Sequence, residues 1–155
     1  MTIAPGDGIP DVELLDSNGD PFRLTRYAGK PFVLYFYPKD DTAGCTREAQ
    51  EFSAHKAEFD AAGAQLLGVS RDSSARHQKF AAKYGLTVPL ATDADESVLA
   101  AFGTWVEKSL YGKKYMGIDR STFLFDAGGR LVRSWRKVRV PGHVEEVLAA
   151  VKALV

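Results

Sequence analysis

Apolar residues in this chain form short continuous runs that alternate with helical stripes. The longest run of aromatic and aliphatic side chains, FVLYFY, covers residues 32–37 and is long enough for a strand buried on both faces. Pro38 follows directly and ends the strand, because proline has no N–H to donate to a neighbouring strand. This run therefore predicts the central strand of a sheet.

The residues after this strand predict a helix and a second strand. A helix over about residues 46–62 would place four side chains on one stripe, and Gly63 stands where a left-handed helix end is common. The stripe consists of Ala49, Phe52, Phe59 and Ala62. Residues 65–70 are mostly apolar and predict the next strand. A strand, a helix and a strand in this order form a right-handed unit with parallel strands.

Turn signals divide the rest of the chain. The sequences DSNGD at 16–20 and DAGG at 126–129 indicate two hairpins, with strands at 12–15 and 22–24 and at 121–125 and 130–138. Further predicted elements are a helix from the Asp72–Ser74 caps to Tyr84, a short strand within 86–92, a short helix within 93–102, a loop over 105–117 and a final helix after Gly142. The last helix would bury Val144, Val147, Leu148 and Val151.

This order of elements predicts an α/β fold with a mixed sheet. A chain of 155 residues with 45% hydrophobic residues fits one domain over residues 1–155, and it can bury a core without disulfides. It has a single cysteine, so no internal disulfide can form, which suits a reducing compartment.

The single cysteine, Cys45, lies where chemistry is favoured. It follows a strand and a short loop, in the first turn of the predicted helix, where free N–H groups and the helix dipole favour a negative charge. A thiol in this position is favoured as the reactive thiolate. The alternative is that Cys45 is a small buried hydrophobic residue, which is the usual role of a free cysteine.

The residues around Cys45 resemble a known family. Pro38, Thr42 and Cys45 have the spacing P-x-x-x-T-x-x-C, which is similar to the active-site motif of the peroxiredoxins. The run YFYPKD…GCT…EA resembles the branch called bacterioferritin comigratory protein or peroxiredoxin Q. The segments FGTWVEKS at 102–109 and GIDRSTFL at 117–124 resemble that branch as well, and the likeness extends over essentially the whole chain.

This resemblance implies a thioredoxin-like fold to which the early hairpin is an N-terminal extension. It also implies roles for three residues besides Cys45. The Thr42 hydroxyl would hydrogen-bond the peroxide and the thiolate, and it is also placed to cap the helix. Arg120 would favour the thiolate and bind the peroxide, and the alternative is a surface charge. The Pro38 ring would shield Cys45 from bulk water, or the residue simply ends the strand.

Three further residues are candidates for the site. Glu48 resembles the acid that orients the arginine in this family, and the alternative is that its charge stabilises the helix start. Trp105 and Tyr37 either line the substrate entrance or pack in the core or on the surface. The three histidines are scattered and lack the spacing of metal ligands, so the sequence predicts no metal site. No glycine-rich fingerprint predicts a nucleotide or flavin cofactor.

The sequence therefore favours a thiol-dependent peroxidase that reduces hydrogen peroxide and alkyl hydroperoxides through Cys45. The alternative is a thioredoxin-like binding or holdase protein without peroxidase turnover. Members of the branch often carry a second cysteine, but Gln50 and residues 80–83 occupy its usual places here. We therefore expect a single-cysteine mechanism in which an external thiol reduces the enzyme, whether thioredoxin, glutaredoxin or a small thiol. A Cys45–Cys45 disulfide between two chains is the competing route. The resemblance implies a monomer, with a dimer as the alternative.

Charge and hydropathy argue against nucleic-acid and membrane partners. The chain has 20 basic and 20 acidic residues, so no net field attracts nucleic acid or an acidic membrane. The one basic cluster favours a solvated strand face over a polyanion site. It consists of Arg130, Arg133, Arg136, Lys137 and Arg139. The sequence contains no membrane span or signal peptide, so the predicted location is the cytoplasm.

Overall fold

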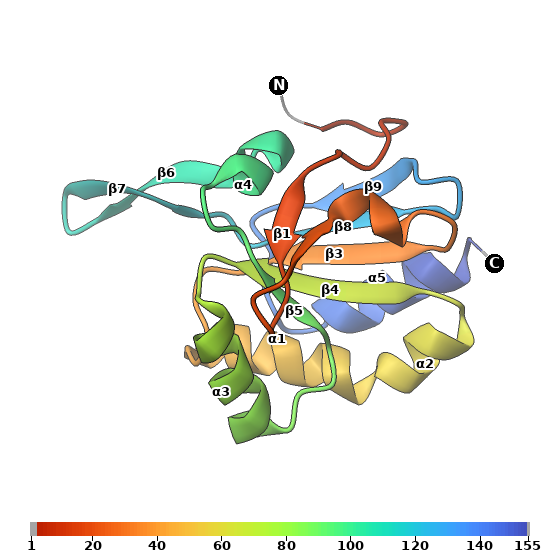
Figure 1. Ribbon diagram of the computed structural model, residues 1–155, viewed down its shortest axis with the longest axis horizontal. Helices are drawn as coiled ribbons and strands as arrows, with labels where there is room; N and C mark the ends of the chain where they lie inside the picture. Colours follow the sequence, from red (N-terminus) through yellow and green to blue (C-terminus); the bar gives the residue numbers. More distant parts are fainter. Residues whose placement is uncertain (1–2, 155) are drawn as a thin grey trace.

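A computed structural model describes residues 3–154 of the chain (Figure 1). In chain order its elements are β1 (Glu13–Leu15), β2 (Pro21–Arg23), the 3-10 helix η1 (Leu24–Tyr27), β3 (Phe32–Phe36), α1 (Ala43–Ala54), α2 (Lys56–Ala61), β4 (Gln65–Ser70), α3 (Ser74–Tyr84), β5 (Leu90–Thr92), α4 (Ser97–Phe102), β6 (Trp105–Leu110), β7 (Lys113–Ile118), β8 (Ser121–Phe125), β9 (Leu131–Trp135) and α5 (His143–Lys152).

Seven of these strands form a mixed sheet in the order β2-β1-β5-β4-β3-β8-β9. The parallel pair β3–β4 confirms the predicted strand–helix–strand unit. Strand β5 also pairs parallel with β4, while β8 pairs antiparallel with β3 and β9 antiparallel with β8. The early hairpin is confirmed as well, because β1 pairs antiparallel with β2 and places Leu14 opposite Phe22. The α/β prediction with a mixed central sheet is therefore confirmed.

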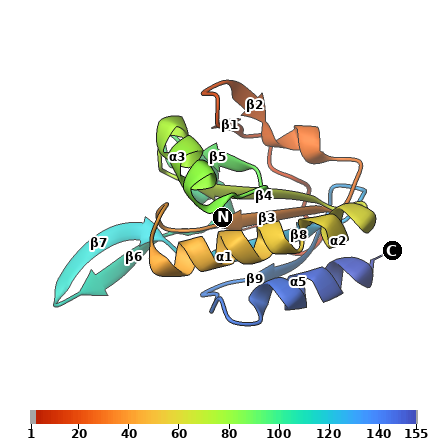
Figure 2. The ribbon, with the colours of Figure 1, turned by 90° about the horizontal axis from the view of Figure 1, so that it is seen from below.

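Helices cover both faces of this sheet (Figures 1 and 2). On one face α1, α2, α3 and α5 bury a cluster that includes Tyr35, Phe52 and Val147. On the other face η1, α4 and the β1–β2 hairpin bury a second cluster around Leu34 and Phe102. Strand β3 belongs to both clusters and all five of its residues are buried, as the apolar run over 32–37 predicts.

The helix predicted over residues 46–62 begins earlier and is divided. Helix α1 begins at Ala43, so Cys45 lies in its first turn as predicted. His55 has φ −97° and ψ 4°, which ends α1, and α2 begins at Lys56. The His55 Nδ1 atom lies 2.9 Å from Glu58 Oε1, which stabilises the start of α2. Ala49, Phe52 and Phe59 are buried along the predicted stripe.

The prediction of a loop over residues 105–117 is wrong. Strands β6 and β7 form an antiparallel hairpin there, which makes a separate two-stranded sheet. Most side chains of both strands are exposed or only partly buried, so the sequence lacks the alternation of polar and apolar residues that identifies a half-buried strand. The turn between the strands is Tyr111–Gly112, in which both residues have positive φ, a geometry that matches the twist of a hairpin.

Smaller differences have local causes. Strand β5 begins only after Pro89, and α4 begins at Ser97, after Glu96 in a left-handed conformation (φ 62°). Strand β9 ends at Trp135, so the last three members of the basic cluster lie in a loop and not on a strand face. One of them, Arg136, donates hydrogen bonds to the carbonyls of Phe102 and Gly103 at the end of α4.

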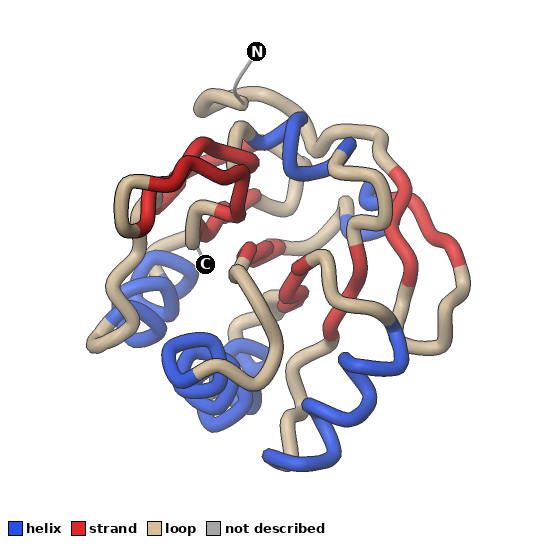
Figure 3. Tube along the Cα trace, turned by 90° about the vertical axis from the view of Figure 1, so that its left-hand side faces the viewer, coloured by secondary structure: helices blue, strands red, loops and turns tan. Residues whose placement is uncertain are grey.

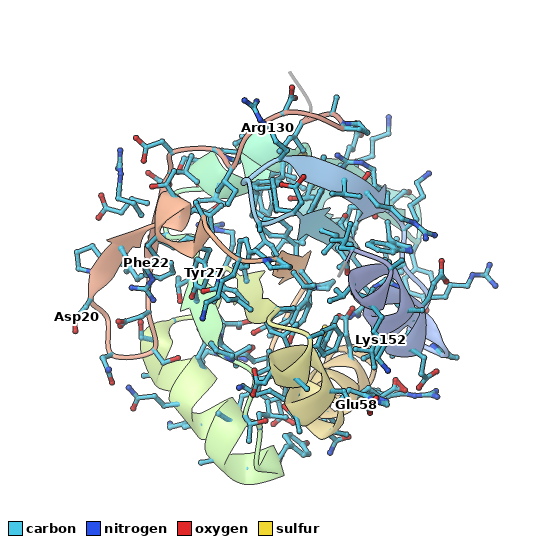
Figure 4. The ribbon with its side chains drawn as sticks, turned by 90° about the vertical axis from the view of Figure 1, so that its right-hand side faces the viewer. Asp20, Phe22, Tyr27, Glu58, Arg130 and Lys152 are labelled. Carbon is cyan, nitrogen blue, oxygen red and sulfur yellow. The ribbon has the colours of Figure 1, made fainter. Side chains whose placement is uncertain are left out.

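The two ends of the sheet differ. One end, where α1 begins and the loop into α5 passes, faces the viewer in Figure 3. At this end the β6–β7 hairpin extends beyond the body of the molecule (Figure 2). At the opposite end α5 and α2 are joined by Lys152 and Glu58, whose Nζ and Oε2 atoms lie 3.5 Å apart (Figure 4). Phe22 and Tyr27 pack edge to face at this opposite end, with ring centroids 6.1 Å apart.

Gly68 on β4 provides a test of this packing. A Cβ atom at Gly68 would lie 2.6 Å from Tyr35 Cζ, and Tyr35 cannot move aside because it is buried and stacked on Phe52 at 4.5 Å. We expect Gly68→Ala to lower the free energy of unfolding by about 2 kcal/mol in urea denaturation. The control Gly8→Ala meets its nearest atom at 3.9 Å and should be nearly neutral. Equal unfolding free energies for the two variants would contradict the close packing of Tyr35.

Candidate active site

Cys45 is the third residue of α1, at the end of the sheet where β3 leads into the loop over residues 37–42. Its side chain is 1% exposed. The first backbone hydrogen bond of the helix runs from Thr46 N to Thr42 O (2.8 Å), so the N–H groups of the three preceding residues lie ahead of the intrahelical ladder. The sulfur is therefore buried beside a partial positive charge, which favours an anion.

Arg120 brings a full positive charge to the sulfur. It lies between β7 and β8, and its Nη2 atom donates a hydrogen bond to Cys45 Sγ at 3.3 Å. Its Nη1 atom donates to Glu48 Oε1 at 2.7 Å. Burial opposes the charge of the guanidinium, but the neighbouring Glu48 and Cys45 outweigh burial and raise the pKa of Arg120. Arg120 is therefore a permanent cation shared by the sulfur and a carboxylate.

Gly44 allows this close approach. A Cβ atom at Gly44 would lie 3.2 Å from Arg120 Nη2, which is tighter than nine in ten such contacts. The missing side chain leaves room for the guanidinium above the first turn of α1. Gly44 lies within the motif that carries the family resemblance, but the sequence indicated no role for it. The signal was present as a glycine in a helical first turn beside the cysteine, where glycine is otherwise unfavourable.

Glu48 is the buried residue that accepts the second hydrogen bond of Arg120. Its side chain is fully buried, and its Oε2 atom has no hydrogen-bond partner within residues 3–154. Burial raises the pKa of Glu48 to about 7, although the charge and hydrogen bond of Arg120 act in the opposite direction. The carboxyl group is therefore poised between its neutral and charged forms near neutral pH.

This raised pKa makes stability depend on pH. A carboxyl group whose pKa is higher in the folded protein contributes stability that is complete below its unfolded value of 4.5 and is lost as pH rises through about 7. We expect the wild type to lose ~3 kcal/mol of unfolding free energy over this range from Glu48, and Glu48→Gln to lack that loss. Urea denaturation of both proteins at several pH values measures the difference. The exposed Glu145→Gln should behave as the wild type, and a Glu48→Gln curve parallel to the wild type would contradict the assignment.

Thr42 occupies the N-cap position of α1, but its side chain makes no capping hydrogen bond. Instead, Thr42 Oγ1 donates to the Lys39 carbonyl at 2.8 Å. The hydroxyl hydrogen is thereby engaged, and the lone pairs of the oxygen remain able to accept a hydrogen bond. Thr42 is exposed at the start of the helix, three residues before the sulfur.

The other predicted residues are distributed around this centre. Pro38 is exposed in the loop between β3 and α1. Tyr37 is buried, and its hydroxyl donates to Asp40 Oδ1 at 2.5 Å inside a cluster with His77, so it packs in the core and does not line an opening. Trp105 is partly buried against the second core cluster, with the Arg71 guanidinium 5.4 Å from its ring centroid.

Two buried residues that the sequence analysis did not include lie close to the site. Burial, and next the charge of Glu48, raise the pKa of Tyr35 well above its ordinary value, and its hydroxyl has no partner among the described residues. His143 Nε2 lies 2.8 Å from Thr122 Oγ1, and burial lowers the pKa of His143 to about 4. Both side chains are therefore neutral at pH 7. A tyrosine within an apolar strand and a histidine after Pro-Gly give no sequence signal of this position.

Comparison with known proteins identifies the family of this chain. Residues 5–134 match the AhpC/TSA family. The chain belongs to this family. It is 51% identical over 143 residues to peroxiredoxin Bcp of Xanthomonas campestris, covering 92% of this chain and 89% of that protein. It is 47% identical to peroxiredoxin Bcp of Bacillus subtilis, covering 98% and 97%.

Solved structures of peroxiredoxins have the same fold as this chain. Peroxiredoxin Q of Xanthomonas campestris superposes with a TM-score of 0.87 at 51% identity, over 92% of this chain and 90% of that chain. A Cys-to-Ser variant of Xylella fastidiosa PrxQ gives 0.92 at 41% identity, over 99% and 98%. The predicted resemblance to the bacterioferritin comigratory protein or peroxiredoxin Q branch, with its thioredoxin-like fold, is thereby confirmed.

Within residues 3–154 no group of three or more His, Cys, Asp or Glu side chains is arranged to hold a metal ion. In the same part of the chain no helix has the length and apolar character needed to cross a membrane. The chemistry that the site can perform is that of a buried sulfur nucleophile with a cation and helix N–H groups beside it.

Proposed function

We propose that Cys45 is the peroxidatic residue of a thiol peroxidase that reduces hydrogen peroxide and alkyl hydroperoxides. The observation that carries this proposal is the 3.3 Å contact from Arg120 Nη2 to Cys45 Sγ at the start of a helix. A structure of the Xanthomonas campestris bacterioferritin comigratory protein, 48% identical to this chain, concerns the alkyl peroxide reduction activity of that protein. The chain is a thiol peroxidase of the same family.

The reaction follows from the charges at the site. The Cys45 thiolate attacks one oxygen of the peroxide, an S–O bond forms and the O–O bond breaks. Cys45 becomes a sulfenic acid, and the other oxygen leaves as hydroxide or alkoxide, which takes a proton to give water or an alcohol. Negative charge moves from sulfur to the leaving oxygen. Arg120 and the first N–H groups of α1 lie where they stabilise this charge in both positions.

The remaining residues hold this geometry. Glu48 accepts the hydrogen bond of Arg120 Nη1 and so fixes the plane of the guanidinium. Pro38 screens the sulfur from bulk water at the end of β3. The Thr42 oxygen, whose hydrogen is engaged with Lys39, accepts the peroxide O–H and aligns the O–O bond with the sulfur.

The role of Thr42 gives a direct prediction. Thr42→Val removes the acceptor and keeps the shape, so we expect peroxide to oxidise Cys45 at least about tenfold more slowly, or ~1.4 kcal/mol of activation free energy. Thr42→Ser keeps the hydroxyl and should retain most of the rate. Stopped-flow measurement of Cys45 oxidation compares the three proteins. An unchanged rate in Thr42→Val would remove this residue from the catalytic group.

The reductant, the location and the oligomeric state belong to the same proposal. The sequence has one cysteine, so an external thiol must reduce the sulfenic acid, and thioredoxin, glutaredoxin and small thiols are the candidates. The proposed enzyme acts in the cytoplasm as a monomer. A thioredoxin-like binding protein without turnover is the rival function. It is disfavoured because a binding surface does not need a buried cysteine paired with a partly buried arginine.

Intact-mass spectrometry after one equivalent of hydrogen peroxide tests the proposed function. We expect the mass to increase by one oxygen atom in the wild type and not in Cys45→Ser. Adding a thiol should restore the original mass through a mixed disulfide. A wild-type protein that gains no oxygen, or one that is oxidised but never reduced by any of the three kinds of thiol, would favour the binding protein.

A further inference from the structure

The β6–β7 hairpin carries exposed apolar side chains that the reaction with peroxide does not use. It extends away from the body of the molecule (Figures 1 and 2). Tyr111 is 97% exposed, Leu110 56%, and Tyr115 and Met116 48% each. These four account for most of the large exposed hydrophobic residues in the described part of the chain. Apolar side chains concentrated on one projection indicate a surface that another molecule covers.

The base of the hairpin is fixed beside the active site. Ile118 is buried at the end of β7, and Trp105 packs against the core with Arg71 near its ring. A backbone hydrogen bond from Asp119 N to Thr104 O (2.8 Å) closes the base. The next residue is Arg120, which contacts Cys45. A molecule bound to the hairpin is therefore held at the end of the protein where the sulfur lies.

The backbone at the tip of the hairpin is strained at Tyr111. Tyr111 has φ 51°, in the left-handed region that costs roughly 1 kcal/mol for a residue with a Cβ atom. Asparagine or glycine is the usual residue at this position of such a turn. Tyr111 is almost fully exposed, so contacts within the described chain do not offset this cost. An exposed aromatic side chain at the tip of a hairpin is suited to anchor a partner.

The strand register separates two faces of the hairpin. Lys108 pairs with Tyr115, and Leu110 pairs with Lys113, so these four side chains share one face, which we call the basic face. Glu107, Met116, Ser109 and Lys114 share the other. On that other face Lys114 Nζ lies 3.7 Å from Glu107 Oε1, so its charges are balanced. The basic face combines two apolar side chains with two cations that no ion pair balances within residues 3–154.

We propose that the basic face and Tyr111 form the docking surface for a protein thiol reductant whose surface around its reactive thiol is acidic. This rests on the proposed function, in which Cys45 must be reduced by an external thiol. The partner thiolate attacks the sulfur of the Cys45 sulfenic acid, an S–S bond forms and the S–O bond breaks. The oxygen leaves as hydroxide, which takes a proton from solvent to give water. A second thiol of the partner then attacks the partner's own sulfur, which releases the Cys45 thiolate and leaves the partner oxidised as a disulfide.

Two other occupants fit the surface less well. A second copy of this chain would bring four uncompensated lysines together, which repels. An anionic lipid surface would match the lysines, but the apolar side chains lie on both faces of the hairpin and would not enter a membrane together. An acidic protein surface matches the charge of the basic face and covers its apolar side chains.

The experiment separates docking from chemistry. The test variant combines Tyr111→Gly, which relieves the left-handed strain, with Lys108→Glu and Lys113→Glu on the exposed basic face. We expect its rate of reduction by a bacterial thioredoxin, recycled by thioredoxin reductase, to fall at least about tenfold. Its oxidation by hydrogen peroxide and its reduction by dithiothreitol should stay within about twofold of the wild type. The control Met116→Ser with Lys114→Gln changes the opposite face and should keep the wild-type rate with thioredoxin.

Other outcomes overturn the proposal. Equal rates of reduction for the wild type and the test variant, measured with thioredoxin and again with glutaredoxin, would do so. Reduction of the wild type by small thiols alone would also do so. A wild type that sediments as a dimer while the test variant sediments as a monomer would overturn it. So would a wild type that binds phosphatidylserine vesicles while the test variant does not. If the proposed peroxidase function itself fails, the wild type gains no oxygen from peroxide, and this separates the two failures.

Discussion

Replacing Arg120 with methionine is expected to slow the reaction of Cys45 with hydrogen peroxide about a hundredfold, equivalent to ~2.7 kcal/mol of activation free energy. Methionine keeps much of the volume and removes both the charge and the donor at 3.3 Å from Sγ. Two effects combine. The thiolate loses its nearest cation, and the leaving oxygen loses a donor while negative charge moves onto it. Stopped-flow oxidation of the variant at several peroxide concentrations gives the second-order rate constant.

Two controls define the Arg120 experiment. Arg120→Lys keeps a charge but loses the forked donors that reach Cys45 and Glu48 together, so its rate should lie between those of the wild type and Arg120→Met. Lys137→Met removes an exposed cation from the nearby loop, whose Val138 N–H bonds the Arg120 carbonyl, and should leave the rate unchanged. If Arg120→Met is folded and reacts as fast as the wild type, the charge beside the sulfur is not what drives the reaction.

The central part of the fold could be predicted because its pattern is local. The apolar run over 32–37, the strand at 65–70 and the helix ending at Gly85 each carry their own signal in sequence, and each lies where the pattern places it. The break at His55 could not be predicted, since the apolar stripe continues from Phe52 to Phe59 across it. The β6–β7 hairpin could not be predicted because its strands bury too few side chains to give an apolar pattern.

The site was predictable only in part. The position of Cys45 at a helix start follows from the chain order, but its partner lies 75 residues away, and only the family resemblance connected it to Arg120. No sequence pattern predicts that one oxygen of Glu48 is buried without a partner within residues 3–154, or that Gly44 makes room for Arg120. These features depend on how separate elements meet in space.

The second large effect concerns what happens after Cys45 is oxidised. The chain has one cysteine, and Gln50 and residues 80–83 occupy the places where related proteins often carry the second. No intramolecular disulfide can then protect the sulfenic acid. We expect peroxide without thiol to convert Cys45 to the sulfinic acid and to abolish turnover, because this step is generally irreversible. With an excess of thiol the mixed disulfide should form first and activity should persist.

Mass spectrometry and non-reducing gels over a series of peroxide concentrations test this expectation. Without thiol the protein should gain two oxygen atoms and stay inactive after dithiothreitol is added. With thiol it should gain none and remain active. A disulfide between two copies is disfavoured because Cys45 is 1% exposed, so both sulfurs would have to leave buried positions. A covalent dimer that dominates even with competing small thiol would show that a second copy, and not an external reductant, resolves the sulfenic acid.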